Sequence, residues 1–252
     1  MESFIKAGHI GPSIIVFDVF GTLVKIGERR SPYRKLMKWL KENGRQPKPD
    51  DAKFIMSQNL SFTELAKLLG INITDQFLQE LGHDLDEELR SIALYEDTLS
   101  TLEELKKLGI KLALCSNLAM PYGKIVSSFL PSLDAYAWSY EVGAIKPESK
   151  IYQSLIDQLG CQASEVLFIG DTALADFTGP TAFGMSARLI KRQNGQTLAE
   201  VLTDILLQLV DVPLRVNTHS SSSFHFLNSA ICSSSSRIHA GFICGTSRRS
   251  TP

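Results

Sequence analysis

The chain has 252 residues and a formal net charge of −1, with 44% hydrophobic and 21% charged residues. This length supports one substantial domain, or a core with a small second domain, and there is no cationic excess for binding nucleic acid. No apolar run approaches the roughly 20 residues that span a bilayer, and the N-terminal residues lack the apolar centre of a signal peptide. Four widely separated cysteines, Cys115, Cys161, Cys232 and Cys244, favour free thiols in a reducing compartment. We therefore expect a cytoplasmic globular protein with no nucleic-acid or membrane partner.

Short apolar runs alternate with amphipathic helical patterns along most of the chain. The predicted strands are residues 13–17, 111–115, 135–140, 165–169 and 186–190, and the predicted helices are 98–108, 121–129, 149–159 and 198–210. Gly109 and Gly160 directly follow two of these helices, as helix-ending glycines do. This alternation predicts an α/β fold with a parallel sheet between two layers of helices.

Residues 27–94 break the alternation. The segment contains no convincing strand, and its apolar periodicity predicts helices at 33–43, 62–69, 75–81 and 85–94. Since it follows the first strand, we expect a small helical cap over residues 27–94, above the carboxyl edge of a core made of residues 1–26 and 95–210. A cap in this position can exclude water and select substrates.

The last part of the chain, residues 211–252, is rich in serine and has no apolar period. We expect a disordered tail there. The alternative is a metal site built from His219, His225, Cys232 and His239.

The most informative stretch is the first strand and the turn after it. The apolar run 14–17 ends in Asp18, and Gly21 and Thr22 follow at once. A buried parallel strand of this kind delivers its last carboxylate to the carboxyl edge of the sheet, where ligands bind. Asp18 is therefore a candidate nucleophile.

Three further groups of polar residues follow strands or open a helix. They are Ser116 and Asn117 after the run 111–115, Lys146 before the helix at 149–159, and Asp171 and Asp176 after the run 165–169. Because the carboxyl ends of parallel strands meet at one edge of a sheet, we expect these groups to converge on Asp18.

The chemistry of these residues fits hydrolysis through a covalent intermediate on Asp18. Asp18, Asp171 and Asp176 form an oxygen-rich set suited to Mg²⁺. Ser116 can donate its hydroxyl to a substrate oxygen, and Lys146 can neutralise charge on Asp18 and on the substrate. Backbone N–H groups of the turn after Asp18 would complete an anion site.

From residue 13 to about residue 208 the chain resembles the haloacid dehalogenase superfamily of phosphatases, phosphotransferases and carbon–halogen hydrolases. The resemblance rests on the four short motifs around Asp18, Ser116, Lys146 and Asp171, in that order and in that strand context. It implies a Rossmann-like core with a helical cap inserted after the first motif. It also implies Asp18 as nucleophile, Ser116 and Lys146 as stabilisers of substrate charge, and a metal held by Asp18, Asp171, Asp176 and the backbone carbonyl of Phe20. Thr22 and Asn117 are candidates for binding substrate, with holding the turn and the loop as their alternative roles.

Phe20 departs from the pattern of the superfamily's phosphatases. They usually carry a second aspartate at this position, which protonates the leaving alcohol and later activates water. The dehalogenase branch has an aromatic residue there, followed by Gly-Thr-Leu, and a halide needs no proton to leave. That branch also uses an arginine near the start of the cap to hold a carboxylate, for which Arg29, Arg30 and Arg34 are candidates.

Asp171 instead favours a metal-dependent enzyme, because metal-independent dehalogenases have a neutral residue in its place. Three converging carboxylates without a cation would repel one another strongly. The interpretation we favour is therefore Mg²⁺-dependent hydrolysis of a small phosphorylated metabolite through an aspartyl-phosphate on Asp18. One alternative is a 2-haloacid dehalogenase that forms an ester on Asp18, and another is a family member that binds a ligand or protein partner without turnover.

Overall fold

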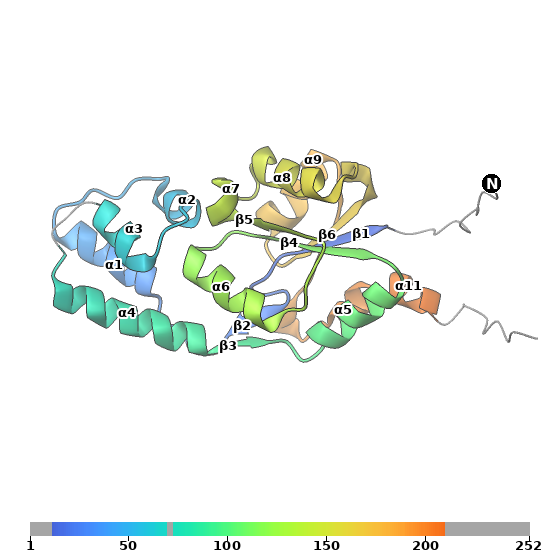
Figure 1. Ribbon diagram of the computed structural model, residues 1–252, viewed down its shortest axis with the longest axis horizontal. Coiled ribbons are helices and arrows are strands. Elements are labelled where there is room, and N and C mark those ends of the chain that lie inside the picture. The colour runs from blue at the N-terminus through green and yellow to red at the C-terminus, as the bar shows by residue number, and fades with distance from the viewer. Residues whose placement is uncertain (1–11, 70–72, 210–252) are drawn as a thin grey trace, which may run out of the picture. The chain divides into compact units, whose positions relative to one another are not determined.

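The core of the protein is a parallel sheet of five strands, in the order β5-β4-β1-β6-β7 (Figure 1). The computed structural model describes residues 12–69 and 73–209. The strands of the sheet are β1 (Ile14–Phe17), β4 (Lys111–Ser116), β5 (Ala135–Trp138), β6 (Val166–Gly170) and β7 (Ser186–Leu189). All four pairings are parallel. The predicted α/β class and Rossmann-like core are confirmed.

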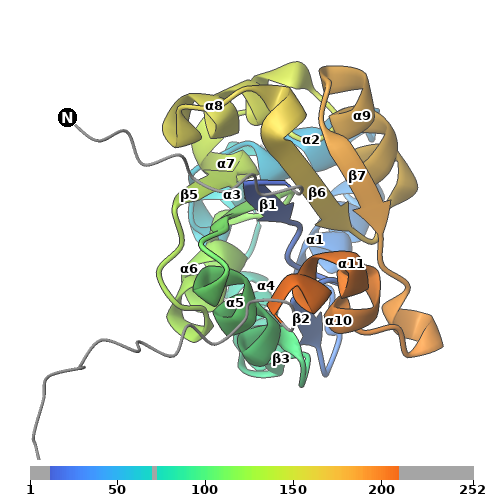
Figure 2. The same cartoon turned by 90° about the vertical axis from the view of Figure 1, so that its right-hand side faces the viewer.

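Both faces of the sheet are buried, because side chains of the central strand alternate between two apolar clusters. Ile14 and Val16 pack with residues of α8 (Ser149–Leu159), whereas Ile15 and Phe17 pack with residues of α5 (Thr98–Lys107). Figure 2 shows these two helices on opposite faces of the sheet. A strand buried on both sides reads as a continuous apolar run, which is why β1 is apparent from the sequence.

Among the residues that the structure describes, the core contains five further helices, most of them shorter than α5 and α8. They are α6 (Met120–Phe129), α7 (Ser139–Val142), α9 (Gly179–Phe183), α10 (Leu198–Val201) and α11 (Thr203–Leu206), with 3₁₀ turns at Ala163–Glu165, Arg192–Asn194 and Leu207–Leu209 and a π-helical segment at Ala173–Thr178.

Two predicted core elements were wrong in extent. The strand predicted at 135–140 ends at Trp138, because Ser139 begins α7. The helix predicted at 198–210 is divided into α10, α11 and a 3₁₀ turn. The Arg188 guanidinium accounts for this break, since it donates to the Val201 carbonyl at 2.8 Å and diverts that carbonyl from a continuous helix.

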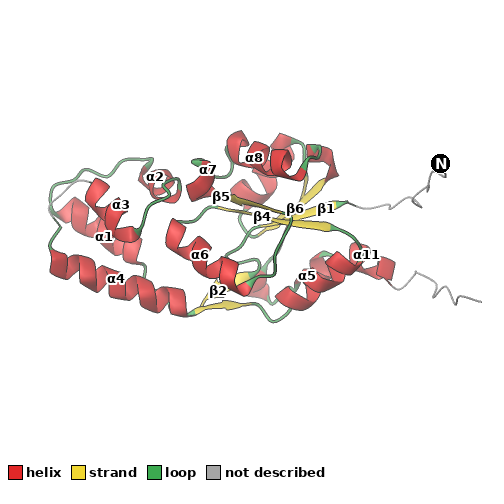
Figure 3. Cartoon of the chain, viewed as in Figure 1, coloured by secondary structure: helices red, strands yellow, loops and turns green. Residues whose placement is uncertain are grey.

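Between the first strand and α5 lie the four helices α1 (Pro32–Glu42), α2 (Asp51–Met56), α3 (Phe62–Leu68) and α4 (Asp75–Arg90) (Figure 3). The two helices predicted at 75–81 and 85–94 are in fact the single helix α4. Gly82 lowers helix propensity, but Leu81, Leu85 and Glu88 form one buried stripe across it, and this packing outweighs the cost of the glycine. Helix α2 was not predicted.

A small antiparallel ribbon joins the two ends of this helical segment to the core. It pairs β2 (Val24–Ile26) with β3 (Ile92–Leu94), although the sequence indicated no strand within 27–94 and a helix up to residue 94. Strands this short carry too little alternation to be recognised, and their pairing depends on residues far apart in the chain. We propose that the ribbon is the neck between the core and a cap formed by α1–α4.

The expected tail, residues 211–252, and its alternative histidine and cysteine metal site lie outside the described residues. Among the helices that the structure describes, none combines the length and the apolar character that crossing a membrane requires.

An ion pair within the proposed cap makes a testable contribution to stability. Both oxygens of Asp51 bind the Arg45 guanidinium, at 2.5 and 2.8 Å, and this hydrogen bonding lowers the pKa of Asp51 to about 2. The pair therefore stabilises the fold fully above the ordinary aspartate pKa, near 4, and its contribution is lost as the pH falls toward 2.

We expect Asp51→Asn to reduce the free energy of unfolding by about 1–2 kcal/mol at pH 7. Urea denaturation measures this loss, and the difference from the wild type should narrow below about pH 4. Asp86→Asn is the matched control, because Asp86 is an exposed acid of α4. A difference between Asp51→Asn and the wild type that is the same at pH 7 and pH 3 would contradict the assigned ion pair.

Candidate active site

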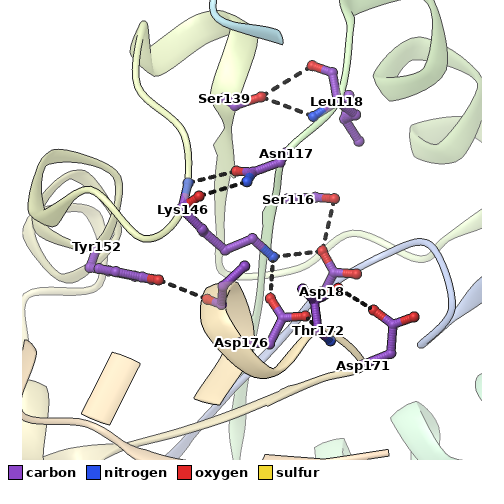
Figure 4. Close-up of polar contacts among 11 residues, drawn as sticks. Asp18, Ser116, Asn117, Leu118, Ser139, Lys146, Tyr152, Asp171, Thr172 and Asp176 are labelled. Atoms are coloured by element: carbon purple, nitrogen blue, oxygen red, sulfur yellow. Dashed lines mark hydrogen bonds and ion pairs between the residues drawn. The ribbon is translucent and has the colours of Figure 1, made fainter. Parts of the chain in front are cut away.

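Asp18 lies at the carboxyl end of the central strand, next to β4 and β6. Its N–H donates to the Ile169 carbonyl at 2.8 Å, which continues the β1–β6 pairing by one residue. Its side chain is buried, since the residue is 7% exposed. Ser116, the last residue of β4, donates its hydroxyl to Asp18 Oδ1 at 3.0 Å (Figure 4). Two of the predicted site residues are thus brought together by neighbouring strands.

Lys146 reaches the same place from the loop before α8. Its Nζ donates to Asp18 Oδ1 at 2.7 Å and to Asp176 Oδ1 at 2.6 Å, and the residue is 3% exposed (Figure 4). Burial by itself would lower the pKa of Lys146, but the two carboxylates outweigh it and raise the pKa above its usual value. The amine therefore stays charged. Ser116 and Lys146 both contact Oδ1 of Asp18, and neither of these bonds involves Oδ2.

Asp18, Asp171 and Asp176 form the cluster of carboxylates that the sequence predicts. Each offers an oxygen atom, and these atoms all lie within 4.8 Å of one another. Burial raises the pKa of Asp18 to about 6, against the opposing effect of Lys146 and with a further rise from Asp176. Burial also raises the pKa of Asp171, and the Asp176 carboxylate adds to it. One lysine is too little positive charge for three carboxylates, and oxygen ligands in this arrangement fit a hard divalent cation such as Mg²⁺.

Two glycines make room for the cluster, and the sequence analysis did not assign them a role. A Cβ atom at Gly170 would lie 2.3 Å from Cγ of Asp176, and one at Gly21 would lie 2.1 Å from Oδ2 of Asp171. Gly21 also has a φ of 79°, which favours glycine. Both glycines lie just after predicted strands whose ends carry carboxylates. A glycine at such a position often marks the close approach of another group, and this pattern could have identified them from the sequence.

The turn after Asp18 uses most of its own N–H groups. Those of Gly21, Thr22, Leu23 and Val24 donate to carbonyls within the turn, at 2.8–3.3 Å. The N–H groups of the turn that remain for the expected anion site are therefore those that precede Gly21.

Asn117 and Thr22 were the predicted substrate-binding residues. The Asn117 side chain bonds the Lys146 backbone twice, donating to its carbonyl at 2.9 Å and accepting from its N–H at 2.7 Å. These bonds favour the alternative role, in which Asn117 holds the lysine loop against the end of β4. The Thr22 hydroxyl is buried and has no hydrogen-bond partner among the described residues.

Arg192, which the sequence analysis did not single out, supports the turn after Asp18 from the loop beyond β7. Its guanidinium donates twice to the Thr22 carbonyl, at 2.7 and 3.0 Å, and to Asp97 at 2.9 Å. It also lies 4.2 Å from the centre of the Tyr95 ring. An isolated arginine carries no motif, so only its contacts reveal this role.

A cavity of about 330 Å³ lies between the proposed cap and the core. Its core side is formed mainly by residues that follow Asp18 and Ser116 in the chain, and its other side by residues of α1, α2 and α4. The residues that line it are Phe20, Ile26, Tyr33, Ala52, Ile55, Met56, Glu88, Asn117, Leu118, Ala119 and Tyr122. Most of this lining is apolar or aromatic.

Several contacts hold the two sides of the cavity together. The buried Ser139 hydroxyl, at the start of α7, donates to the Met56 carbonyl at 2.6 Å and accepts from the Leu118 N–H at 2.9 Å. The Tyr122 hydroxyl of α6 donates to Glu88 of α4 at 2.8 Å. The proposed cap therefore contacts the core on both sides of the cavity.

None of the arginines proposed to hold a carboxylate lines this cavity. Arg29 and Arg34 are exposed. The Arg30 guanidinium pairs with Glu28 at 2.7 Å.

The fold and the cluster of motifs define a class of hydrolases, and the comparison with protein families gives the same class. The model of haloacid dehalogenase-like hydrolases matches residues 12–184, and the chain belongs to this family. The predicted resemblance is thus confirmed.

Relatives within the family differ in chemistry. A ribulose-1,5-bisphosphate 5-phosphatase of Halopiger xanaduensis is 32% identical over 104 residues, which cover 40% of this chain and 44% of that protein. The chain thus spans less than half the length of that relative. An (S)-2-haloacid dehalogenase of Burkholderia cepacia is 28% identical over 194 residues, which cover 71% of this chain and 82% of that enzyme.

The fold is also similar to that of solved structures. An HAD family enzyme from Bacteroides thetaiotaomicron, solved as a complex with magnesium and inorganic phosphate, matches with a TM-score of 0.55 and 17% identity. The match covers 76% of this chain and 99% of that one. At this identity, the likeness concerns the fold alone.

Proposed function

We propose that the protein is a Mg²⁺-dependent phosphatase that acts on a small phosphorylated metabolite through an aspartyl-phosphate on Asp18. The observation that carries the proposal is the cluster of Asp18, Asp171 and Asp176, whose oxygen atoms lie within 4.8 Å of one another, with Lys146 bonded to Asp18 and Asp176. A divalent cation would offset the remaining negative charge, which otherwise repels an anionic substrate.

In this proposal, Asp18, Asp171, Asp176 and the Phe20 carbonyl hold the cation. When bound, the cation supplies positive charge to the phosphate oxygens. The Asp18 carboxylate attacks phosphorus, and the bond to the leaving oxygen breaks with its electron pair. Ser116 and Lys146 donate hydrogen bonds to the phosphoryl oxygens as charge develops. Water then hydrolyses the aspartyl-phosphate, which releases phosphate and restores the carboxylate.

Phosphate release from acetyl phosphate and from an aryl phosphate tests the proposal. We expect release with Mg²⁺, a loss of at least about 100-fold in excess EDTA, and recovery when Mg²⁺ is added back. Acetyl phosphate is used because its leaving group departs without a proton donor. Full activity in EDTA would contradict the metal-dependent mechanism.

A 2-haloacid dehalogenase remains the second candidate, because Phe20 occupies the position of the missing acid and dehalogenases are among the relatives. Against it stands the cavity, whose lining includes no arginine or lysine to hold a substrate carboxylate. Halide release from 2-chloropropionate in EDTA would favour this candidate over the phosphatase.

Phe20→Asp provides a separate prediction about the missing acid. We expect the new carboxyl group to raise kcat/KM for unactivated esters such as glycerol phosphate by about tenfold or more, because it can protonate the leaving alkoxide. Phe20→Leu is the matched control, since it removes the ring that packs edge-on against Tyr122 but adds no acid. The absence of any gain in Phe20→Asp would mean that another group already serves as the acid.

A further inference from the structure

We propose that the substrate is the phosphate monoester of an uncharged aryl group, whose ring occupies the cavity between cap and core. This inference rests on the proposed phosphatase function and specifies its substrate class. It is carried by the lining of the cavity, by the Tyr33 hydroxyl, which has no partner among the described residues, and by the absence of a proton donor at Phe20.

The cavity excludes charge. Among the described residues, Glu88 is the only carboxylate in its lining, and no lysine or arginine lines it. Glu88 is 4% exposed, and its two oxygens accept from the Arg30 N–H, the Ser31 N–H and the Tyr122 hydroxyl, at 2.6–2.8 Å. A charged organic group, such as a carboxylate or a second phosphate, would find no positive side chain in this lining to pair with.

The polar groups of the lining are also occupied, with one exception. The side chain of Asn117 is bonded to the Lys146 backbone, and the Tyr122 hydroxyl is bonded to Glu88. The hydroxyl of Tyr33 is buried and has no hydrogen-bond partner among the described residues. A buried hydroxyl without a partner is costly, so a ligand atom that accepts its hydrogen would be favoured. A sugar, with several hydroxyl groups to satisfy, fits this lining poorly.

The shape and composition of the cavity favour a ring. Phe20 packs edge-on against Tyr122, with ring centres 5.9 Å apart, and Tyr122 lies 6.2 Å from Tyr33. Ile55 and Met56 of α2 also line the cavity. A volume of about 330 Å³ is roughly twice that of an engineered cavity of ~150 Å³ that binds benzene. It therefore accommodates one substituted ring.

The chemistry beside Asp18 independently favours leaving groups that need no proton, and aryl oxygens are among them. When Asp18 attacks phosphorus, the electron pair of the breaking P–O bond leaves on the organic oxygen. Phe20 cannot protonate that oxygen, so an alkoxide leaves slowly, whereas a phenolate is stable enough to leave and takes its proton from water afterwards. An aryl ester therefore needs neither the missing acid nor a polar pocket.

A substrate panel with one pocket variant tests the proposal, with acetyl phosphate as the reference that needs no ring site. With Mg²⁺, we expect kcat/KM for phenyl phosphate to exceed that for phosphoserine and for glucose 6-phosphate by at least about 100-fold. Ala52 is exposed on α2 and lines the cavity, so Ala52→Phe fills the site without displacing buried atoms. We expect this variant to lower kcat/KM for phenyl phosphate by about tenfold relative to acetyl phosphate. Ala199→Phe, at an exposed position of α10, is the matched control.

Tyr33→Phe tests the unpartnered hydroxyl. We expect it to lower kcat/KM about tenfold for at least one of the 2-, 3- and 4-acetylphenyl phosphates. The isopropylphenyl phosphates have the same shape but no acceptor, and they should change less than twofold.

The outcomes distinguish failure of the phosphatase function from failure of the aryl substrate class alone. No phosphate from acetyl phosphate would overturn the phosphatase function and the substrate class with it. Turnover of acetyl phosphate combined with equal or better use of phosphoserine or glucose 6-phosphate would overturn the aryl class alone. Equal losses in Ala52→Phe and Ala199→Phe would also overturn it, because the cavity would then not hold the ring.

Discussion

Asp18→Asn is expected to abolish phosphate release, with residual activity below about one thousandth of the wild type. The amide lacks the negative charge that attacks phosphorus, although it keeps the shape of the carboxylate. It can still accept the hydrogen bonds that Ser116 and Lys146 donate to Asp18 Oδ1, at 3.0 and 2.7 Å. The fold around the site should therefore be preserved.

The melting temperature separates loss of the nucleophile from loss of the fold. Asp18 is buried in a cluster with more negative than positive charge, so removing its charge in the absence of Mg²⁺ should leave the melting temperature equal to or above that of the wild type. Asp86→Asn, at an exposed acid of α4, should retain full activity. Activity of Asp18→Asn above a thousandth of the wild type would count against Asp18 as the nucleophile.

Lys146→Met is expected to have the second largest effect, a loss of kcat/KM of about 10²–10³-fold. Lys146 is the only positive side chain bonded to the carboxylates of Asp18 and Asp176 in the part of the chain that the structure describes. Methionine fills a similar volume and removes the charge. The phosphoryl oxygens would then lose a hydrogen-bond donor at the moment when their charge is greatest.

The same change should also destabilise the metal-free protein. Removing Lys146 leaves two buried carboxylates without their partner, which costs about 3–5 kcal/mol when a buried ion pair is broken. Thermal unfolding with and without Mg²⁺ measures this effect, and the added cation should recover part of the loss. Lys150→Met, at an exposed position of α8, is the control. Wild-type activity in Lys146→Met would remove Lys146 from the proposed mechanism.

The resemblance to the family and the α/β class could be predicted from the sequence because both depend on local patterns. The strand that ends at Asp18 is buried on both faces, so its apolar run is continuous and its end is marked by a carboxylate. The residues Ser116, Lys146, Asp171 and Asp176 lie beside strand ends or a helix start, and parallel pairing then brings them together.

Elements whose existence depends on distant residues could not be predicted. The pairing of Val24–Ile26 with Ile92–Leu94 joins segments separated by the whole helical region, and neither strand has enough residues to show alternation. Two helices were predicted at 75–81 and 85–94, but the buried stripe through Leu81 and Leu85 keeps α4 continuous. The helix predicted at 198–210 divides where Arg188, from β7, binds the Val201 carbonyl.

The sequence by itself determined the family, the class of fold and the set of polar residues that meet at the carboxyl edge of the sheet, because these follow from the order of strands and from short motifs. The tertiary structure alone decided how the surrounding groups are used. It bonded Asn117 to the Lys146 backbone, made Gly21 and Gly170 the points of closest approach to the acids, and formed a mostly apolar cavity between Phe20 and the proposed cap. Contacts between residues far apart in the chain leave no periodic or local signal in the sequence, and they became apparent only when the chain was folded.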